Sequence, residues 1–202
     1  MQAVNESKKA ADAILGKEAA LPDLKNPDLL TWTIINRYDL RPGAPFDLDS
    51  HPYLVGLYKC TAKTIVVRKA GQIGVSEWLV SYALHAADVR KMDILYLMPT
   101  EQTLRDFSTT RLGMAAEASP YLRSILIQQS TSDRRGSDSQ SLKRVRDNWI
   151  YMRGASVTSD ASSPKLKSVP ADGIIMDEFD EIDERAPELA RKRMGHSRIA
   201  EE

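Results

Sequence analysis

The stretch TIVVRKAGQIGVSEW, residues 64–78, constrains the fold more than any other part of the sequence. Thr64–Arg68 is β-branched as far as Val67 and predicts a strand. Gly71 and Gly74 then allow a tight turn and a close approach of the backbone to a ligand. The run SEWLVSYALHAA that follows is helix-compatible, and the N-terminus of a helix favours an anion. A strand, a glycine-containing turn and a helix in this order predict a phosphate-binding loop.

The loop departs from the usual pattern, G-x-x-x-x-G-K-[ST], in the position of its lysine. Ser76 stands where the magnesium-binding hydroxyl is expected, but Val75 precedes it in place of the lysine. The nearest cations are Arg68 and Lys69, at the start of the loop. A long side chain from there could fold across the loop to the same phosphates. An ordinary strand, turn and helix with an exposed lysine remains the alternative at this point.

A second motif is ADGIIMDEFDEID, residues 171–183. The apolar run Gly173–Met176 predicts a short buried strand that ends in Asp177 and Glu178. Ligands of open α/β sheets bind outside the carboxyl ends of the strands. Both acids are therefore expected near the loop Lys69–Ser76, called the glycine loop below. Asp177 would hold magnesium indirectly, and Glu178 would polarise an attacking water. The alternative is a solvated acidic turn, because further acids follow as far as Glu184. The pairing of the two motifs favours a nucleotide-hydrolysing site.

The remaining pattern predicts an α/β fold around a mostly parallel sheet, because strands alternate with helices. The polar stretch 128–148 predicts a mobile loop or a hairpin. Residues 1–28 predict a peripheral helix, and residues 31–60 an apolar helix, a Pro/Gly break and another short helix. Strands are expected at Thr64–Arg68, Asp93–Thr100, Asn148–Ala155 and Gly173–Phe179, and helices at Glu77–Val89, Glu101–Ala118 and Glu188–Arg193.

Composition limits the classes of function. A chain of 202 residues, of which 42% are hydrophobic, fits one domain with a sizeable core. Basic and acidic residues balance at 28 each, so any contact with nucleic acid would come from local patches. The single cysteine, Cys60, excludes an intramolecular disulfide framework and fits a reducing compartment. No apolar run approaches membrane-spanning length and no signal-peptide core is seen, so a soluble intracellular protein is expected.

Two further stretches have both a DNA-binding and a structural interpretation. In LMPTEQTLRDF, Thr100 and Gln102 would contact a DNA backbone from a helix N-terminus, or Thr100 would simply cap that helix. Five basic residues either line a DNA channel or lie in a solvated loop whose acids dilute their charge: Arg134, Arg135, Lys143, Arg144 and Arg146. The three histidines show no metal-ligand spacing with Cys60, and no metal is assigned to them.

From about Trp32 to Ile199 the sequence resembles the large terminase subunits of tailed bacteriophages, most closely the lambda-type branch. The resemblance rests on five stretches in the order of the family: W…RYDL…PGAPFDLDSHPYL, KAGQIGVSEWL, ILYLMPTEQTLRDFSTTRLGMAAEASPYLRSIL, RGASVTSDASSPKLKSVPADGIIMDEFDEID and PELARKRM. That branch carries a deviant phosphate loop with its lysine at the start. The resemblance therefore implies that Lys69 contacts the phosphates and that PFDLDSHPYL occupies the place of the adenine-side motif.

The resemblance also implies a fold: a RecA-like, additional-strand (ASCE) P-loop ATPase core, with a mostly parallel central sheet flanked by helices. Ser76 and Asp177 would organise Mg²⁺, Glu178 would be the catalytic carboxylate, and Arg68 would be a second phosphate contact. An N-terminal helical and adenine-side segment is expected at residues 1–58, and the ATPase core at 59–202. The implied nucleotide-binding loop comprises Arg68, Lys69, Ala70, Gly71, Gln72, Ile73, Gly74, Val75, Ser76 and Glu77.

The implied function is the ATPase motor of a DNA-packaging terminase, which hydrolyses ATP with Mg²⁺ to translocate double-stranded DNA into the procapsid. The expected partners are double-stranded DNA, the portal protein, the small terminase subunit and sister subunits in a ring, with no membrane. Such a protein would work in the host cytoplasm and be absent from the mature virion. Complete large terminases continue into a coupling motif and a nuclease domain. Neither follows the acidic motif here, so the core is expected to be truncated and to carry no nuclease site.

Two other classes of function remain open. The first is a helicase-like, nucleic-acid-dependent ATPase, which shares the loop, the MPT element and the paired acids. The lysine-first loop and the block PGAPFDLDSHPYL favour packaging over that class. The second is a catalytically inactive, terminase-derived assembly module that binds DNA, portal or sister subunits without turnover.

Overall fold

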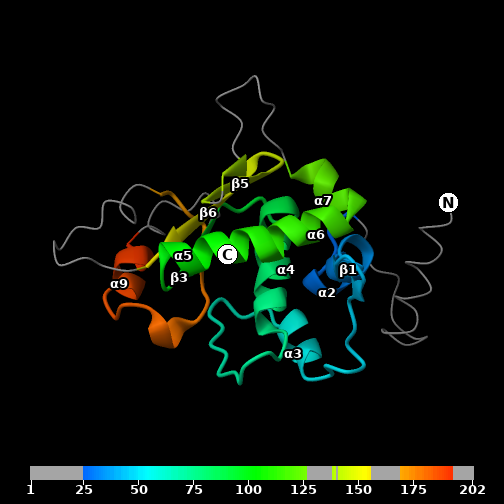
Figure 1. The fold of residues 1–202 in the computed structure, drawn as a ribbon, viewed down its shortest axis with the longest axis horizontal. Helices are drawn as coiled ribbons and strands as arrows, with labels where there is room; N and C mark the ends of the chain where they lie inside the picture. The colour runs from blue at the N-terminus through cyan, green and yellow to red at the C-terminus, as the bar shows by residue number, and fades with distance from the viewer. Residues whose placement is uncertain (1–24, 127–137, 140, 156–168, 193–202) are drawn as a thin grey trace.

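The computed structural model describes residues 25–126, 138–139, 141–155 and 169–192. These residues form a five-stranded sheet with helices packed on it, and a small two-stranded sheet beside the helices (Figure 1). In chain order the elements are α2 (Leu29–Asn36), β1 (Asp39–Arg41), β2 (Ala44–Pro45), α3 (Leu54–Tyr58), α4 (Val75–Asp88), β3 (Ile94–Met98), α5 (Glu101–Phe107), η1 (Ser108–Gly113), α6 (Met114–Ala118), α7 (Pro120–Ile125), β4 (Asp138–Ser139), β5 (Leu142–Val145), β6 (Asn148–Gly154), β7 (Gly173–Met176), η2 (Phe179–Glu181) and α9 (Ala186–Arg191).

The five-stranded sheet has the order β4-β5-β6-β3-β7. Its strands β6, β3 and β7 are parallel, with Tyr96 of β3 paired to Met152 on one side and to Ile175 on the other. Strands β4 and β5 extend this sheet in the antiparallel sense. The predicted parallel arrangement is therefore confirmed for three strands. The stretch 128–148 is expected to be a loop or a hairpin, and in its described part β4 and β5 pair as an antiparallel hairpin. Residues 128–137 and 140 lie outside the described residues.

The strand expected at Thr64–Arg68 is not formed. Within the described residues this segment pairs with no other strand, and Val66 is 90% exposed. Ile65 and Val67 are only partly buried against the cluster of α2, α3 and α4. A strand exists through hydrogen bonds to a neighbouring strand, so β-branched residues without such a neighbour form an irregular segment instead. The prediction was wrong because it rested on the β propensity of residues 64–68 alone, and among the described residues these have no neighbouring strand to pair with.

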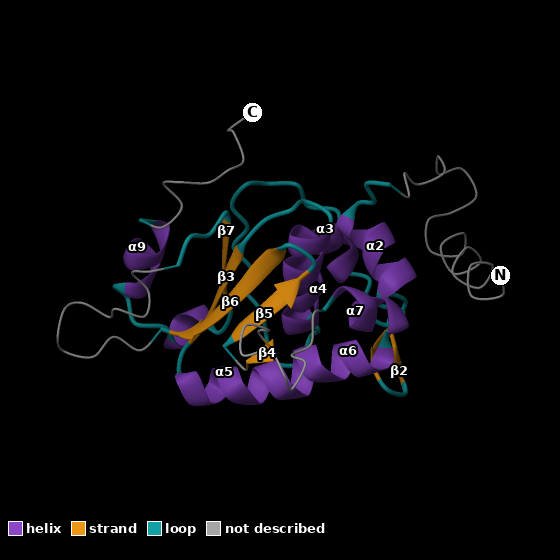
Figure 2. Cartoon of the chain, turned by 90° about the horizontal axis from the view of Figure 1, so that it is seen from above, coloured by secondary structure: helices purple, strands orange, loops and turns teal. Residues whose placement is uncertain are grey.

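In the described part of the chain, one face of the sheet is covered by helices. Side chains of α4, of the α5–α6 run and of α7 pack against that face, to which Tyr96, Ile150 and Ile175 belong. Figure 2 shows the α5–α6 run lying along one side of the sheet. The opposite face carries Leu95 and Leu97, and the described residues that cover it include α9. The sheet is thus packed on both of its faces.

The helix predictions are largely confirmed. Helix α4 starts two residues before the predicted Glu77–Val89 and ends one residue before its end, and α9 spans Ala186–Arg191 in place of 188–193. The predicted helix Glu101–Ala118 is one continuous helical run, but its middle, Ser108–Gly113, is a π-helix. Helices α2 and α3 confirm the two short helices expected between residues 31 and 60. The peripheral helix expected over 1–28 lies mostly outside the described residues.

The end of β6 is locked against the start of α5. A Cβ atom on Gly154 would lie 2.4 Å from the backbone N of Glu101, closer than real Cβ atoms approach other atoms. The backbone N–H of Gly154 donates to Oε1 of Glu101 at 3.3 Å. Only glycine allows this contact, which brings the carboxyl end of β6 against the N-terminus of α5. No helix in the described part of the chain is long and apolar enough to cross a membrane.

Candidate active site

The glycine loop turns directly into α4. Gly74 is the residue before the helix and adopts φ +81°, the left-handed region that favours glycine. A Cβ atom there would also lie 3.0 Å from Cδ1 of Leu54. Gly74 has no side chain that could cap the first turn of α4. The N–H groups that open this 14-residue helix therefore face the loop, which is the arrangement that suits a bound anion.

Lys69, at the start of the loop, meets the acids at the end of β7. Its Nζ atom donates to Oε1 of Glu178 at 2.9 Å and lies 3.7 Å from Oδ1 of Asp177. Burial alone would lower the pKa of Lys69, but the hydrogen bond to Glu178 and the negative charge of Asp177 outweigh it and raise this pKa above its ordinary value. Lys69 is therefore a fixed positive charge at the carboxyl end of the sheet.

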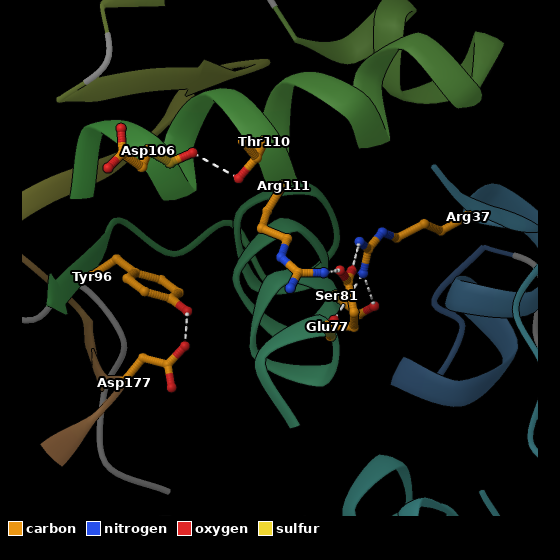
Figure 3. A network of polar contacts seen from close by, with 8 residues as sticks. All are labelled: Arg37, Glu77, Ser81, Tyr96, Asp106, Thr110, Arg111 and Asp177. Carbon is orange, nitrogen blue, oxygen red and sulfur yellow. Dashed lines mark hydrogen bonds and ion pairs between the residues drawn. The ribbon is translucent and has the colours of Figure 1, made fainter. Parts of the chain in front are cut away.

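Asp177 is a buried carboxylate with a partner on each oxygen. Only 2% of the residue is exposed. The backbone N–H of Glu178 donates to Oδ1 at 3.0 Å, and the hydroxyl of Tyr96 donates to Oδ2 at 3.2 Å (Figure 3). The interpretation of this motif as a solvated acidic turn is therefore wrong for Asp177. It holds for the acids that follow and are exposed: Asp180, Glu181 and Glu184.

Glu178 has an unusual backbone. Its φ of 52° and ψ of 49° place it in the left-handed region, which costs a non-glycine residue free energy. The chain turns sharply here, from β7 into η2. Its side chain is 40% exposed, whereas the side chain of Asp177 is 1% exposed. The turn thus keeps one acid inside the sheet layer and presents the other toward Lys69. Such strain concentrates at functional sites.

Ser76 and Glu77 lie in the first turn of α4 but differ in their surroundings. Ser76 is half-buried. Glu77 is held between two arginines: Oε1 accepts from Arg111 at 2.6 Å, and Oε2 accepts from the fully buried Arg37 (Figure 3). Arg37 also donates at 2.8 Å to the carbonyl of Glu77 and at 2.8 Å to Oγ of Ser81. Glu77 is therefore engaged in fixing the start of α4.

The oxygen donors at the predicted metal positions are of the kind that suits Mg²⁺ shared with phosphates. The described residues contain no group of three or more His, Cys, Asp or Glu side chains that could hold a metal ion by themselves. What they offer is a hydroxyl on Ser76 and the carboxylate of Asp177. These are hard oxygen donors of the kind that Mg²⁺ accepts while retaining waters and phosphate oxygens. The residues present therefore fit this ion as part of a metal–nucleotide complex.

The segment 51–54 packs on the glycine loop. The hydroxyl of Tyr53 donates to the carbonyl of Ile73 at 3.2 Å, and Leu54 contacts Gly74. The Tyr53 ring is nevertheless exposed, at 53%, and the ring of His51 meets it edge-on with centroids 5.8 Å apart. An exposed aromatic ring is thus attached to the loop at the end of the segment PFDLDSHPYL.

The other predicted positions have more ordinary surroundings. Thr100 caps α5, since its Oγ1 accepts from the N–H of Thr103 at 3.1 Å, and the structural interpretation of this residue is confirmed. Arg68 is exposed beside the loop. Among the basic residues of the polar stretch, Arg146 is bound to Asp88 at 2.6 Å, and Arg144 lies 5.5 Å from the centroid of the Trp149 ring. Arg134 and Arg135 lie outside the described residues.

Three residues of this region escaped sequence reasoning. Tyr96 interrupts the otherwise aliphatic strand ILYLM, and a polar atom in a strand buried throughout is the signal that could have found it. Arg37 and Arg111 carry no comparable signal, because their contacts with Glu77 join segments that are 40 and 34 residues apart in the chain. Only the folded arrangement brings these side chains together.

A comparison with protein-family models found a match over residues 42–198, to the family described as phage terminase large subunit gpA, ATPase domain. The matched span contains the glycine loop, Tyr96 and both acids. Comparisons with curated proteins and with solved structures found no match.

Proposed function

Because the chain belongs to the phage terminase large subunit gpA ATPase domain family, we propose that it is the ATP-hydrolysing motor that translocates double-stranded DNA into a procapsid. Membership supports a packaging role and the use of ATP. The translocation step and the roles of individual residues are our proposal. One observation carries the residue roles most directly: Lys69 and Glu178, 109 residues apart in the chain, lie within hydrogen-bonding distance of each other.

The proposed site uses Lys69 in place of the usual lysine before the hydroxyl. Its Nζ atom would contact the terminal phosphates, with Arg68 as a second phosphate contact and the backbone of residues 70–77 wrapped around them. Phosphate oxygens would then replace Glu178 as the partner of Lys69. This exchange leaves the Glu178 carboxylate free to polarise the attacking water.

Ser76 and Asp177 would hold Mg²⁺, Asp177 acting through bound water. The bound ion supplies charge neutralisation at the phosphates. The chain itself supplies orientation: Ser76 lies in the first turn of α4, and two hydrogen bonds to Asp177 fix its carboxylate. Glu77 belongs to the predicted loop, but its side chain would support the loop indirectly, by fixing the start of α4 through ion pairs with Arg37 and Arg111.

The wider assignment follows the family. We infer a RecA-like, additional-strand core over residues 59–202, preceded by an adenine-side segment within 1–58. The parallel strands β6, β3 and β7 and the helix that follows the glycine loop support it. The partners proposed are double-stranded DNA, the portal protein, the small terminase subunit and sister subunits in a ring, all in the host cytoplasm.

Calorimetric titration of a magnesium–ATP analogue tests the proposal. The wild-type chain, Lys69→Ala and Lys63→Ala are compared after circular dichroism shows that all three are folded. Lys63 is an exposed lysine shortly before the loop and serves as the matched control. Saturable binding that is lost in Lys69→Ala alone supports the lysine-first site. Equal binding by all three chains would remove Lys69 from its role.

A catalytically inactive assembly module is the second candidate, and the missing strand at 64–68 favours it. A segment without strand partners holds the loop less firmly than a paired strand would. Absence of saturable nucleotide binding by the folded wild-type chain would move this candidate ahead. Binding with measurable turnover would remove it. A helicase-like ATPase would also bind nucleotide, and is separated by whether turnover responds to single-stranded or to double-stranded nucleic acid.

A further inference from the structure

Tyr96 lies at the centre of the sheet, in a position where a tyrosine is not needed for packing alone. Strand β3 has β6 on one side and β7 on the other, and Tyr96 is 1% exposed. Its ring packs against the ring of Phe107 on α5, with centroids 5.2 Å apart. The other four residues of β3 are Ile94, Leu95, Leu97 and Met98, all buried and apolar. A phenylalanine would fill the same space, so the hydroxyl is the feature that requires an explanation.

Among the described residues, the side chain that accepts from this hydroxyl is that of Asp177. The hydroxyl donates to Oδ2 at 3.2 Å, and Figure 3 shows the tyrosine pointing from β3 toward the carboxylate at the end of β7. The register of the strands brings the two together, because the backbone N–H of Asp177 donates to the carbonyl of Leu97 at 3.1 Å. The backbone of Tyr96 is paired on both sides and its ring packs on Phe107, so its hydroxyl has a fixed direction.

The two carboxylate oxygens of Asp177 have different partners. Oδ2 faces the sheet and Tyr96, whereas Oδ1 accepts from the N–H of Glu178 and faces Lys69 at 3.7 Å. A buried carboxylate must be hydrogen-bonded to remain charged at low cost. Without the tyrosine, the carboxylate would keep only the bonds on its Oδ1 side and could rotate about its Cβ–Cγ bond.

We propose that Tyr96 is a positioning residue that holds the Asp177 carboxylate with Oδ1 turned toward the bound metal–nucleotide complex. The inference rests on the proposed function, since it deepens the role of one residue of that site. Partners of this kind orient metal-binding carboxylates, and their loss typically costs about 10- to 100-fold in metal affinity. The effect of Tyr96 should therefore be seen in the part of nucleotide binding that depends on Mg²⁺.

The test compares nucleotide affinity with and without the metal. Wild type, Tyr96→Phe and Tyr121→Phe are titrated with a non-hydrolysable ATP analogue in excess Mg²⁺ and again in excess EDTA, and the ratio of the two Kd values gives the gain from Mg²⁺. Tyr121 is the matched control, because its hydroxyl donates at 2.6 Å to another buried aspartate, Asp88. We expect the gain to fall about tenfold in Tyr96→Phe. Binding in EDTA, and the gain in Tyr121→Phe, should stay at the wild-type values.

The possible outcomes separate this inference from the proposed function. A wild-type chain that binds no analogue would overturn both. If the wild type gains affinity from Mg²⁺ and Tyr96→Phe gains equally, only the role of Tyr96 is overturned. Equal losses in Mg²⁺ and in EDTA would also overturn it, because they would show a general packing effect.

A second set of variants tests whether Tyr96 acts through Asp177. The gain from Mg²⁺ is measured in Asp177→Asn and in the double variant with Tyr96→Phe. If the tyrosine works by orienting the carboxylate, the double variant loses no more of the gain than Asp177→Asn alone. If instead the fold-loss of the Mg²⁺ gain in the double variant equals the product of the fold-losses in the two single variants, Tyr96 acts independently of Asp177. That result would overturn the inference.

Discussion

The Nζ atom of Lys69 lies 2.9 Å from Oε1 of Glu178, so the lysine at the start of the loop and the second acid after β7 neutralise each other. Both side chains are partly exposed, and exposed ion pairs of this kind contribute at most about 1 kcal/mol. A nucleotide carries several negative charges and can displace such a partner. The pair therefore describes a resting arrangement that ligand binding is able to open.

Glu178→Gln should retain nucleotide binding and lose hydrolysis. The amide cannot accept the proton of the attacking water, and general bases typically contribute about 100- to 10,000-fold to a rate. Affinity for an ATP analogue should be equal or higher, because Lys69 loses its hydrogen-bonded carboxylate partner and keeps the more distant Asp177. Phosphate release and calorimetric binding measure the two effects. Glu181→Gln, an exposed acid of η2, is the matched control. An unchanged rate in Glu178→Gln would remove Glu178 from catalysis.

Tyr53→Ala should weaken binding of the nucleotide base without weakening binding of the phosphates. The exposed ring is anchored to the glycine loop through the Ile73 carbonyl and could stack on an adenine. We expect the Kd of an ATP analogue to rise by about tenfold, in line with about 1–3 kcal/mol for stacking of a base on an aromatic ring. Binding of magnesium tripolyphosphate should stay unchanged, as both titrations can measure. Equal losses for the two ligands would instead point to damage to the loop.

Asp88→Asn should remove stability that depends on pH. Burial alone would raise the pKa of Asp88, but hydrogen bonds from Tyr121, Arg146 and Trp32 outweigh it and lower this pKa below 3.8. The stabilisation by the carboxylate is therefore complete above pH 3.8 and is lost as the pH falls through the lower folded-state pKa.

Urea unfolding at neutral and acidic pH measures this contribution. At neutral pH the wild type should be about 2 kcal/mol more stable than Asp88→Asn, the scale of a hydrogen bond to a buried charge. The difference should shrink once the pH falls below 3.8. Asp147→Asn replaces a carboxylate whose side chain is 95% exposed and should leave stability nearly unchanged. A difference for Asp88→Asn that is independent of pH would show that charge plays no part.

Gly154→Ala should destabilise the fold and displace the start of α5. The added methyl group would meet the backbone N of Glu101 at 2.4 Å, and backbone cannot move aside as a side chain can. Overpacking of this kind typically costs about 1–3 kcal/mol. Gly56→Ala is the control, because nothing lies within 4 Å of its added Cβ in α3, and it should stabilise by about 0.5–1 kcal/mol. Thermal unfolding of both variants compares the two effects, and equal stability of Gly154→Ala and wild type would contradict the clash.

The family and most of the helices and strands could be predicted from the sequence, because the motifs are local. The resemblance to phage terminase large subunits is confirmed by the family match over residues 42–198. Strands β3, β6 and β7 follow from runs of apolar residues that end in polar ones. The prediction of a strand at 64–68 was wrong, since strand pairing depends on a neighbouring strand that no local sequence pattern specifies.

The site was predictable only in part, for a related reason. Ser76, Asp177 and Glu178 could be chosen from spacing, and Lys69 through the resemblance to the terminase family. Their roles remain predictions. The arginines that hold Glu77 and the tyrosine that holds Asp177 depend on the tertiary fold. The left-handed backbone of Glu178 was not predictable either, because glycine and asparagine, not glutamate, normally indicate that conformation.

The π-helical segment between α5 and α6 has a consequence for which residues face the core. Arg111 stands seven residues after Leu104, and two turns of a regular α-helix would bring it to the same inward side. The wider turn slips the helix by one residue, so Leu112 takes the inward place and is 4% exposed. Arg111 falls at the slip and reaches Glu77 instead. The run from α5 to α6 thus keeps its apolar side chains on the side that faces the sheet. Arg111, which is displaced from that side, links this run to Glu77 in the first turn of α4.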